Sequence, residues 1–195
     1  MENIIFDLGG VVFARDPRKC PVELVDFFSF VRFSTMPVFW EEYDRGVLSV
    51  EEVTRILGQL KGREEPEVKK LIDESIIRQE EIPSTRDLIR ALKDHGYRLY
   101  VLSNMSKEYI AFLRKKPVYR LFDGEIVSCE HGTVKPEPEI YRILLDRYRL
   151  NPARSLFIDD RPANLETART FGIQTFLFDH RDPVHSCEQL RKMLL

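Results

Sequence analysis

The sequence contains few cysteines and histidines, and none is spaced as a metal-binding or disulfide pair. The three cysteines among 195 residues are odd in number, far apart and without a C-x-x-C motif. This pattern excludes a disulfide framework and a zinc site, and it favours a reducing compartment in which each cysteine is a small buried residue. They are Cys20, Cys129 and Cys187. The four histidines form no H-x-x-x-H or H-E-x-x-H pair, and we expect them to be structural or solvated.

Long apolar runs and blocks of basic residues are also missing. No run of about 18 apolar residues occurs, and no charged and then apolar leader is seen, so we expect a cytoplasmic protein. The net charge of −2, with Lys and Arg scattered, gives no electrostatic reason to expect nucleic acid or a membrane as a partner. With 43% hydrophobic and 32% charged residues, the chain suits one globular domain with an insertion, or one domain and a small second one.

The first dozen residues combine a buried strand with a carboxylate. The run Ile4–Phe6 has the length and branching of a buried strand, and it stops at Asp7. Gly9 and Gly10 follow, and they allow the backbone to turn and a ligand to approach the main-chain N–H groups. In parallel α/β sheets the ligand crevice lies outside the carboxyl ends of the strands, so Asp7 is placed for chemistry.

Residues from about Ala14 to Ile82 show helical spacing of apolar residues and no strand pattern. Ser49 and Glu52 form a capping box that begins one helix, and Pro66 opens another. The aromatic residues of this region are expected to pack inside it rather than to contact a substrate; they are Phe39, Trp40 and Tyr43. The region is therefore predicted to be a helical insertion after the first strand.

From Ser84 onward, helices and strands alternate. Further strands are predicted at residues 98–102, 125–128, 155–158 and 175–178, and helices are expected to begin at Ser84, Ser106, Pro138, Pro162 and Asp182-Pro183. Parallel neighbours need crossover helices, so this alternation indicates a parallel sheet that is covered on both faces.

Polar groups follow several of these strands. Asp7, Ser103-Asn104 and Asp159-Asp160 each come at the end of a strand, and a polar loop after another strand carries Lys135. Because parallel strands end at the same edge of a sheet, these groups are expected to meet although they are far apart in the chain.

The order Asp, Ser, Lys, Asp-Asp resembles the haloacid dehalogenase-like (HAD) superfamily. The matching segments are 6–12 (FDLGGVV), 101–104 (VLSN), 134–137 (VKPE) with Ile140-Tyr141, and 157–160 (FIDD). The resemblance implies a Rossmann-like α/β core at residues 1–13 and 83–195 and a helical C1-type cap at 14–82. The first motif, with residues 45–49 of the cap, looks like the branch that includes an α-D-glucose-1-phosphate phosphatase.

By this resemblance the protein is a phosphatase that acts on a small phosphorylated metabolite, with sugar 1-phosphates as one candidate class. Asp7 is then the nucleophile that forms an aspartyl-phosphate, and Lys135 pairs with Asp7 and the phosphate. The phosphate oxygens would be held by Gly10, Ser103, Asn104 and Lys135. The ligands of a magnesium ion would be Asp7, the Gly9 carbonyl, Asp160 and, directly or through water, Asp159.

The chemistry of the residues supports a cation independently. Each pair of like charges ~4 Å apart costs roughly 4 kcal/mol at an effective dielectric constant of ~20, so Asp7, Asp159 and Asp160 cannot share a site uncompensated. Oxygen ligands of this kind suit Mg²⁺. Phosphoryl transfer also needs a nucleophile, a cation and donors aimed at the phosphate oxygens, and the converging residues offer all of these types.

Gly9 departs from the family pattern. Most HAD phosphatases carry a second aspartate there, which protonates the leaving group, a step typically worth ~10²–10⁴ in rate. With Gly9 at this position, three alternatives remain open. The enzyme acts on substrates with acidic leaving groups, it uses a proton donor from the cap or the substrate, or it hydrolyses no substrate. A catalytically weak phosphate-binding or regulatory protein is therefore an alternative. A dehalogenase would need no acidic pair, and a receiver domain has another motif order and no helical insertion.

For some of these residues, a purely structural role is an alternative to a functional one. Asp159-Asp160 followed by Arg161-Pro162 is compatible with an ordinary helix cap. Arg32 and Arg45 are candidate contacts for a polar substrate, although a solvated surface position is the expectation for both. Arg161 and His131 border the expected site, and the sequence does not decide their roles. Neither the substrate nor the oligomeric state is determined by the sequence.

Overall fold

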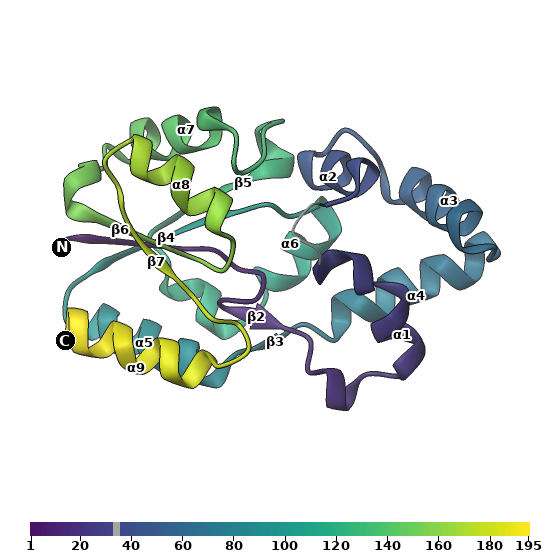
Figure 1. Ribbon diagram of the computed structural model, residues 1–195, viewed down its shortest axis with the longest axis horizontal. Coiled ribbons are helices and arrows are strands. Elements are labelled where there is room, and N and C mark those ends of the chain that lie inside the picture. The colour runs from purple at the N-terminus through teal and green to yellow at the C-terminus, as the bar shows by residue number, and fades with distance from the viewer. Residues whose placement is uncertain (33–35) are drawn as a thin grey trace.

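The computed structural model describes residues 1–32 and 36–195, with Arg32 described for its backbone only. Its centre is a parallel sheet in the order β5-β4-β1-β6-β7 (Figure 1). The strands are β1 (Asn3–Phe6), β4 (Arg98–Ser103), β5 (Gly124–Val127), β6 (Ser155–Asp159) and β7 (Gln174–Leu177). β1 pairs in parallel with both β4 and β6, so it lies in the middle of the sheet. The prediction of an α/β fold with a parallel sheet is confirmed.

Helices cover both faces of the sheet because its strands are apolar on both faces. In β1, Ile4 and Phe6 pack with α5 and α9, whereas Ile5 packs with α7 and α8. These helices are α5 (Pro83–Asp94), α7 (Pro138–Tyr148), α8 (Pro162–Thr170) and α9 (Pro183–Leu194). Figure 1 shows α7 and α8 on one side of the sheet and α5 and α9 on the other. Burial on both sides explains why the strands are continuous apolar runs in the sequence.

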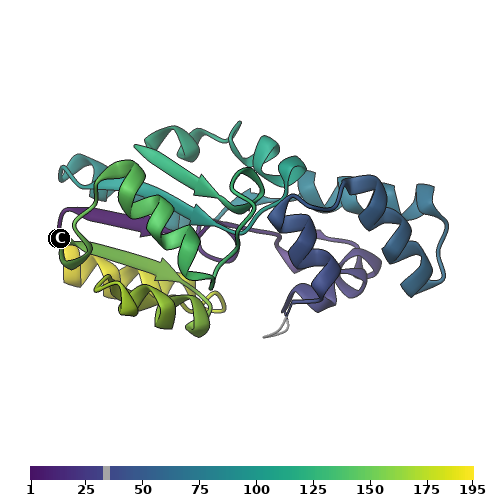
Figure 2. The same ribbon diagram turned by 90° about the horizontal axis from the view of Figure 1, so that it is seen from above.

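Further helices lie beyond the carboxyl ends of the strands. They are α1 (Val22–Phe27), α2 (Val38–Arg45), α3 (Val50–Lys61) and α4 (Glu65–Ile77). Figure 2 shows the strand arrows pointing toward this part of the chain. The helices share a hydrophobic cluster of their own, to which Trp40 and Tyr43 belong, as expected. The capping box of Ser49 and Glu52 is present, and it begins α3.

The two crossings between the sheet and this helical segment form a small antiparallel ribbon. β2 (Phe13–Ala14) pairs with β3 (Glu80–Glu81), and the N–H of Ile82 donates to the carbonyl of Val12 at 2.9 Å. The prediction that no strand occurs between residues 14 and 82 is therefore wrong. Two-residue strands are too short to show a period of two, and their pairing joins segments that are far apart in the chain.

Several local predictions also differ from the structure. Helix α5 begins at Pro83 rather than at Ser84, and no side chain caps it. Ser106 precedes α6 (Lys107–Leu113) as expected, but its side chain makes no capping hydrogen bond. Cys129 and Cys187 are buried, whereas Cys20 is partly exposed. Short 3-10 helices occur at η1 (Pro17–Lys19), η2 (Ser29–Arg32), η3 (Pro117–Leu121), η4 (Ser128–Glu130) and η5 (Pro152–Arg154).

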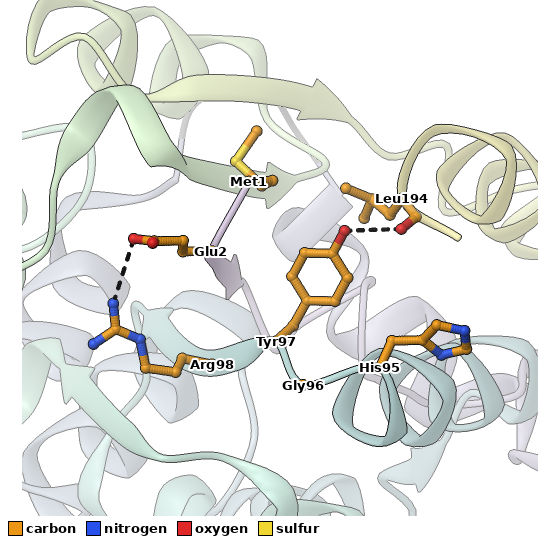
Figure 3. A pocket seen from close by; sticks show the side chains of 7 residues that line it. All are labelled: Met1, Glu2, His95, Gly96, Tyr97, Arg98 and Leu194. Atoms are coloured by element: carbon orange, nitrogen blue, oxygen red, sulfur yellow. Dashed lines mark hydrogen bonds and ion pairs between the residues drawn. The ribbon is translucent and has the colours of Figure 1, made fainter.

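A cavity of about 510 Å³ opens at the edge of the sheet where β1 and β4 begin. Tyr97 donates its hydroxyl hydrogen to the carbonyl of Leu194 at 2.8 Å, and Glu2 and Arg98 form an ion pair there (Figure 3). This cavity lies at the amino ends of the strands, away from Asp7. Among the described residues, no helix has both the length and the apolarity to cross a membrane.

Candidate active site

The expected strand ends lie side by side in the sheet. β4, β1 and β6 are neighbours, and their registers align Phe6 with Val101 and with Ile158. Asp7 follows directly after β1, while Ser103 and Asp159 are the last residues of β4 and β6. The pairing of parallel strands therefore brings these three side chains to one place at the carboxyl edge of the sheet.

Lys135 joins two of the carboxylates. Its Nζ atom lies 2.9 Å from Oδ1 of Asp7 and 2.6 Å from Oδ2 of Asp159, and its side chain is only 2% exposed. The hydroxyl group of Ser103 donates to the same Oδ1 of Asp7 at 2.9 Å. Burial alone would lower the pKa of Lys135, but the charges of Asp159 and Asp7 outweigh it and raise this pKa. Lys135 is therefore a charged ammonium group that holds both acids in place.

The loop that carries Lys135 is held from both sides. Asn104 donates its side-chain amide to the carbonyl of Lys135 at 2.8 Å and accepts the N–H of Lys135 at 2.7 Å. Glu137 accepts hydrogen bonds from the Thr133 hydroxyl and the Val134 N–H. The Asn104 side chain thus orients Lys135. Only the main chain of Asn104 is left for the predicted contact of this residue with phosphate.

Asp159 is surrounded by donors of the protein itself. Besides Lys135, it accepts the N–H of Arg161 at 2.8 Å and the amide of Asn164 at 3.0 Å on each of its two oxygens. Its side chain is fully buried. Both of its oxygens are thus occupied, and this arrangement favours a role in orienting Lys135 over direct contact with a metal. Asn164 was not identified from the sequence; its place in the first turn of the helix after Asp159-Asp160 was the only available indication.

Asp160 completes a group of acids that suits a hard cation. Carboxylate oxygens of Asp7, Asp159 and Asp160 lie within 4.8 Å of one another. Asp7 and Asp160 keep 11% and 17% of their side chains exposed. Burial, and then the charge of Asp7, raise the pKa of Asp160 to about 6. One lysine cannot balance three acids, so the excess charge and the oxygen donors fit a magnesium ion.

His180 contacts Asp160, with Nδ1 3.1 Å from Oδ2. His180 is exposed, as the sequence predicts for a solvated histidine, but the loop after β7 also brings it to the edge of the site. His131 lies beside Arg147 instead, with its Nε2 3.4 Å from Nη1 of the arginine.

The two glycines after Asp7 have different surroundings. Gly10 has a φ of +77°, and a Cβ atom there would lie 2.8 Å from Oδ2 of Asp160, so a side chain would disturb the acid. Its N–H donates to the carbonyl of Phe13 at 2.8 Å. This differs from the prediction for Gly10, because the N–H assigned to phosphate is used inside the turn. A Cβ atom at Gly9 would meet nothing within 4 Å.

The helical segment contacts residues that surround the site. Arg45 is not a solvated cation: its side chain is 17% exposed and lies 2.8 Å from Oε1 of Glu137, the residue that holds the lysine loop. Arg161 donates to the carbonyl of Val31 at 3.1 Å. The prediction for the Arg32 side chain lies outside the described residues. Sequence patterns did not identify Glu137 as a partner of Arg45, because the two are distant in the chain.

Comparisons with known proteins agree with this geometry. A family model described as haloacid dehalogenase-like hydrolase matches residues 1–172. A sesquiterpene phosphatase of Aspergillus oryzae is 27% identical over 97% of this chain and 95% of its own length. A D-ribitol-5-phosphate phosphatase of Bacteroides thetaiotaomicron is 27% identical, covering 90% and 91%. A HAD family enzyme of the same bacterium, crystallised with magnesium and inorganic phosphate, has a TM-score of 0.72, 23% identity and coverage of 92% and 95%.

Proposed function

Because the chain belongs to the haloacid dehalogenase-like hydrolase family, we propose that it is a magnesium-dependent phosphatase of small phosphorylated metabolites. The single observation that carries this proposal is the buried Lys135, whose ammonium group lies between Asp7 and Asp159. Such a group holds the Asp7 carboxylate in one orientation at the end of β1, as a nucleophile requires. Relatives that are named phosphatases support the same reaction class.

Asp7 is proposed to attack the phosphorus of the substrate with its carboxylate oxygen. A bond then forms between this oxygen and phosphorus, and the substrate alcohol leaves, so that one difficult displacement is divided into two easier ones. Ser103 and Lys135 restrict Asp7 to one orientation, because both donate to its Oδ1. Together with main-chain N–H groups near Asn104, they form a fixed set of donors for the charged phosphate oxygens.

Magnesium is proposed to be held by Asp7, Asp160 and the Gly9 carbonyl, with Asp159 acting through water. When bound, this ion neutralises the charge that gathers on the acids and on the phosphate. The residues supply oxygen donors at the carboxyl ends of rigid strands, which is the ligand type that Mg²⁺ prefers. A solved structure of similar fold contains both magnesium and phosphate, in agreement with this assignment.

The substrate class rests on the helical segment, which we propose to be a C1-type cap at residues 14–82, inserted in a core at 1–13 and 83–195. Two contacts between this segment and the site, from Arg45 to Glu137 and from Arg161 to Val31, support its role as a lid. Sugar 1-phosphates remain one candidate substrate, because the anomeric oxygen is an acidic leaving group that tolerates the absence of an acid at Gly9.

The test is a screen of phosphorylated metabolites and p-nitrophenyl phosphate with and without Mg²⁺. The wild type is expected to release phosphate only with the metal, and Asp7→Asn to lose at least ~10³-fold in kcat, because a nucleophile has been removed. Asp26→Asn, an exposed position on α1, is the matched control. Full Mg²⁺-dependent turnover in the Asp7 variant would contradict the nucleophile assignment, and no turnover in the wild type would favour the phosphate-binding alternative.

A further inference from the structure

The donor turn, residues 103–105, follows β4 and belongs to the proposed phosphate site. The side chains of its first two residues bind the proposed nucleophile and the lysine loop. The N–H of its third residue, Met105, donates to the hydroxyl oxygen of Ser128 at 2.9 Å, so this N–H is not free to bind phosphate. Among the described residues, no acceptor binds the N–H of Asn104. The N–H of Asn104 is therefore the main-chain donor that the turn offers to a phosphate oxygen.

Ser128 shares its hydroxyl group between the donor turn and the helical segment. It is fully buried and is the first residue of η4, directly after β5. While its oxygen accepts the N–H of Met105, its hydrogen goes to the carbonyl of Asp44 in the last turn of α2. The carbonyl of Met105 is a second, more distant acceptor at 3.5 Å. Because a hydroxyl group has only one hydrogen to donate, the orientation of this group depends on the position of α2.

The end of α2 is packed against the same part of the core by its backbone. Gly46 has a φ of +82°, and a Cβ atom there would lie 2.6 Å from the carbonyl oxygen of Cys129, the residue after Ser128. Arg45 forms its ion pair with the lysine loop at 2.8 Å. These contacts on the C-terminal side of Asp44 hold its carbonyl next to Ser128. A shift of α2 away from the core therefore breaks the hydrogen bond between Asp44 and Ser128.

Resting on the proposed phosphatase function, we propose that Ser128 is a positioning residue that aligns the donor turn for phosphate and makes this alignment depend on the docked position of α2. The shared hydroxyl group carries the inference. Without it, the N–H of Met105 loses its acceptor, and the peptide group between Asn104 and Met105 is free to rotate. The N–H of Asn104 then loses its fixed direction, and donors stabilise a charged phosphate best when their direction is fixed before it binds.

The first test compares Ser128→Ala with Ser155→Ala. Ser155 is also fully buried, and its hydroxyl group likewise accepts one amide hydrogen, from Asn3 at 3.1 Å, and donates to one main-chain carbonyl, that of Asn151 at 2.8 Å. Ser128→Ala is expected to lower kcat about tenfold and to raise the inhibition constant of inorganic phosphate by a similar factor. Ser155→Ala is expected to leave both within about twofold. Equal effects in the two variants would show a merely structural role and overturn the inference.

The second test moves α2 and follows the exchange of the Met105 amide hydrogen by NMR. Gly46→Ala pushes α2 away from Cys129, whereas Gly62→Ala, at the end of α3, adds a Cβ atom that meets nothing within 4 Å. Both glycines have a positive φ, so the backbone strain of the two variants is matched. Exchange at Met105 is expected to accelerate at least tenfold in Gly46→Ala and to stay unchanged in Gly62→Ala. Unchanged exchange in Gly46→Ala would overturn the dependence on α2.

A pair of variants of similar shape keeps the inference testable if Ser128→Ala is unstable. Ser128→Thr retains the hydroxyl group and Ser128→Val lacks it, so only the threonine variant is expected to keep slow exchange at Met105 and a kcat within about threefold of the wild type. Identical behaviour of the two would contradict a role of the hydroxyl group. A wild type without turnover would refute the phosphatase proposal alone, because the exchange of the Met105 amide would still support or overturn the alignment by Ser128.

Discussion

Charge balance decides the arrangement of individual residues in the site. Asp7, Asp159 and Asp160 meet one buried ammonium group, that of Lys135, so negative charge is in excess where the strands end. Asp159 is surrounded by four donor contacts, whereas Asp160 keeps a raised pKa because burial and Asp7 disfavour its charged form. The excess charge is a cost to the metal-free protein, and it is the reason for a cation at this place.

We expect Mg²⁺ to stabilise the protein in a pH-dependent way. The folded pKa of Asp160 is raised from 3.8 to about 6, so the metal-free fold binds this proton more tightly than the unfolded chain. The contribution of Asp160 to the stability of the metal-free protein therefore falls as pH rises from 3.8 to about 6. Bound Mg²⁺ needs the ionised acid, so its effect grows as pH rises through about 6.

The measurement is a thermal melt with and without the metal at pH 5.5 and 7.5. At about 100 times the dissociation constant, Mg²⁺ adds ~2.7 kcal/mol, or roughly 5–10 °C in Tm at pH 7.5 for a chain of this size. The shift is expected to shrink at pH 5.5 and to vanish in Asp160→Asn. An equal shift at both pH values would contradict the assignment of Asp160 as a ligand.

At the scale of elements, α2 and the lysine loop form one unit across the site. Glu137 accepts from Thr133 and Val134 in the loop and pairs with Arg45 on α2. The Arg45 guanidinium holds the pKa of Glu137 at about 2, well below its usual value. The pair therefore contributes its full stability above the usual pKa of 4.5 and loses it progressively as pH falls from there through about 2.

Removing the charge of Glu137 is expected to weaken both attachments. Glu137→Gln keeps the size of the side chain but loses a charged acceptor, for which ~1.5–3 kcal/mol is typical. Since every 1.4 kcal/mol is about tenfold, we expect kcat to fall at least tenfold as Lys135 and α2 lose their fixed positions. Glu139→Gln, an exposed neighbour that pairs with Arg142, serves as control in the same steady-state assay; equal rates for both variants would disprove a positioning role.

On the scale of the whole molecule, two hydrophobic clusters meet at α6. Ile110 and Leu113 belong to the cluster of the sheet, and Tyr109 belongs to that of the helical segment. Met105 and Phe112 pack against both clusters. Because α6 begins just after Ser103 and Asn104, it links the helical segment to β4, whose last residue Ser103 donates to Asp7. The helical segment therefore has a hydrophobic core of its own, and Figure 2 shows this segment beyond the ends of the strands.

A core substitution in the helical segment is expected to loosen that segment first. Ile72 is fully buried there, and Ile72→Ala removes packing worth ~2–5 kcal/mol. Amide hydrogen exchange is then expected to accelerate in α3 and α4 while β1, β4 and β6 stay protected. Ile158→Ala, an equally buried position in β6, is the comparison and should accelerate exchange throughout. Uniform acceleration in the Ile72 variant would show that the two clusters unfold as one.

Much of the fold could be predicted because its causes are local. Apolar runs that end in Asp7, Ser103 and Asp159 mark buried parallel strands, and the capping box of Ser49 and Glu52 marks the start of α3. The convergence of Asp7, Lys135 and Asp159 also followed, since parallel strands end at one edge. Local pattern failed for Ser84, where no side chain caps the helix that begins at Pro83.

The sequence by itself determined the order of strands and helices, the residue types at each strand end and the lack of an acid at Gly9. Only the packing of the folded chain produced the β2–β3 ribbon, the donors around Asp159 and the pairing of Arg45 with Glu137. The two groups of features differ in the separation along the chain of the residues that interact. Hydrophobic period and capping depend on neighbours within one turn or strand, whereas these contacts join residues that only the packing of helices on a twisted sheet brings together.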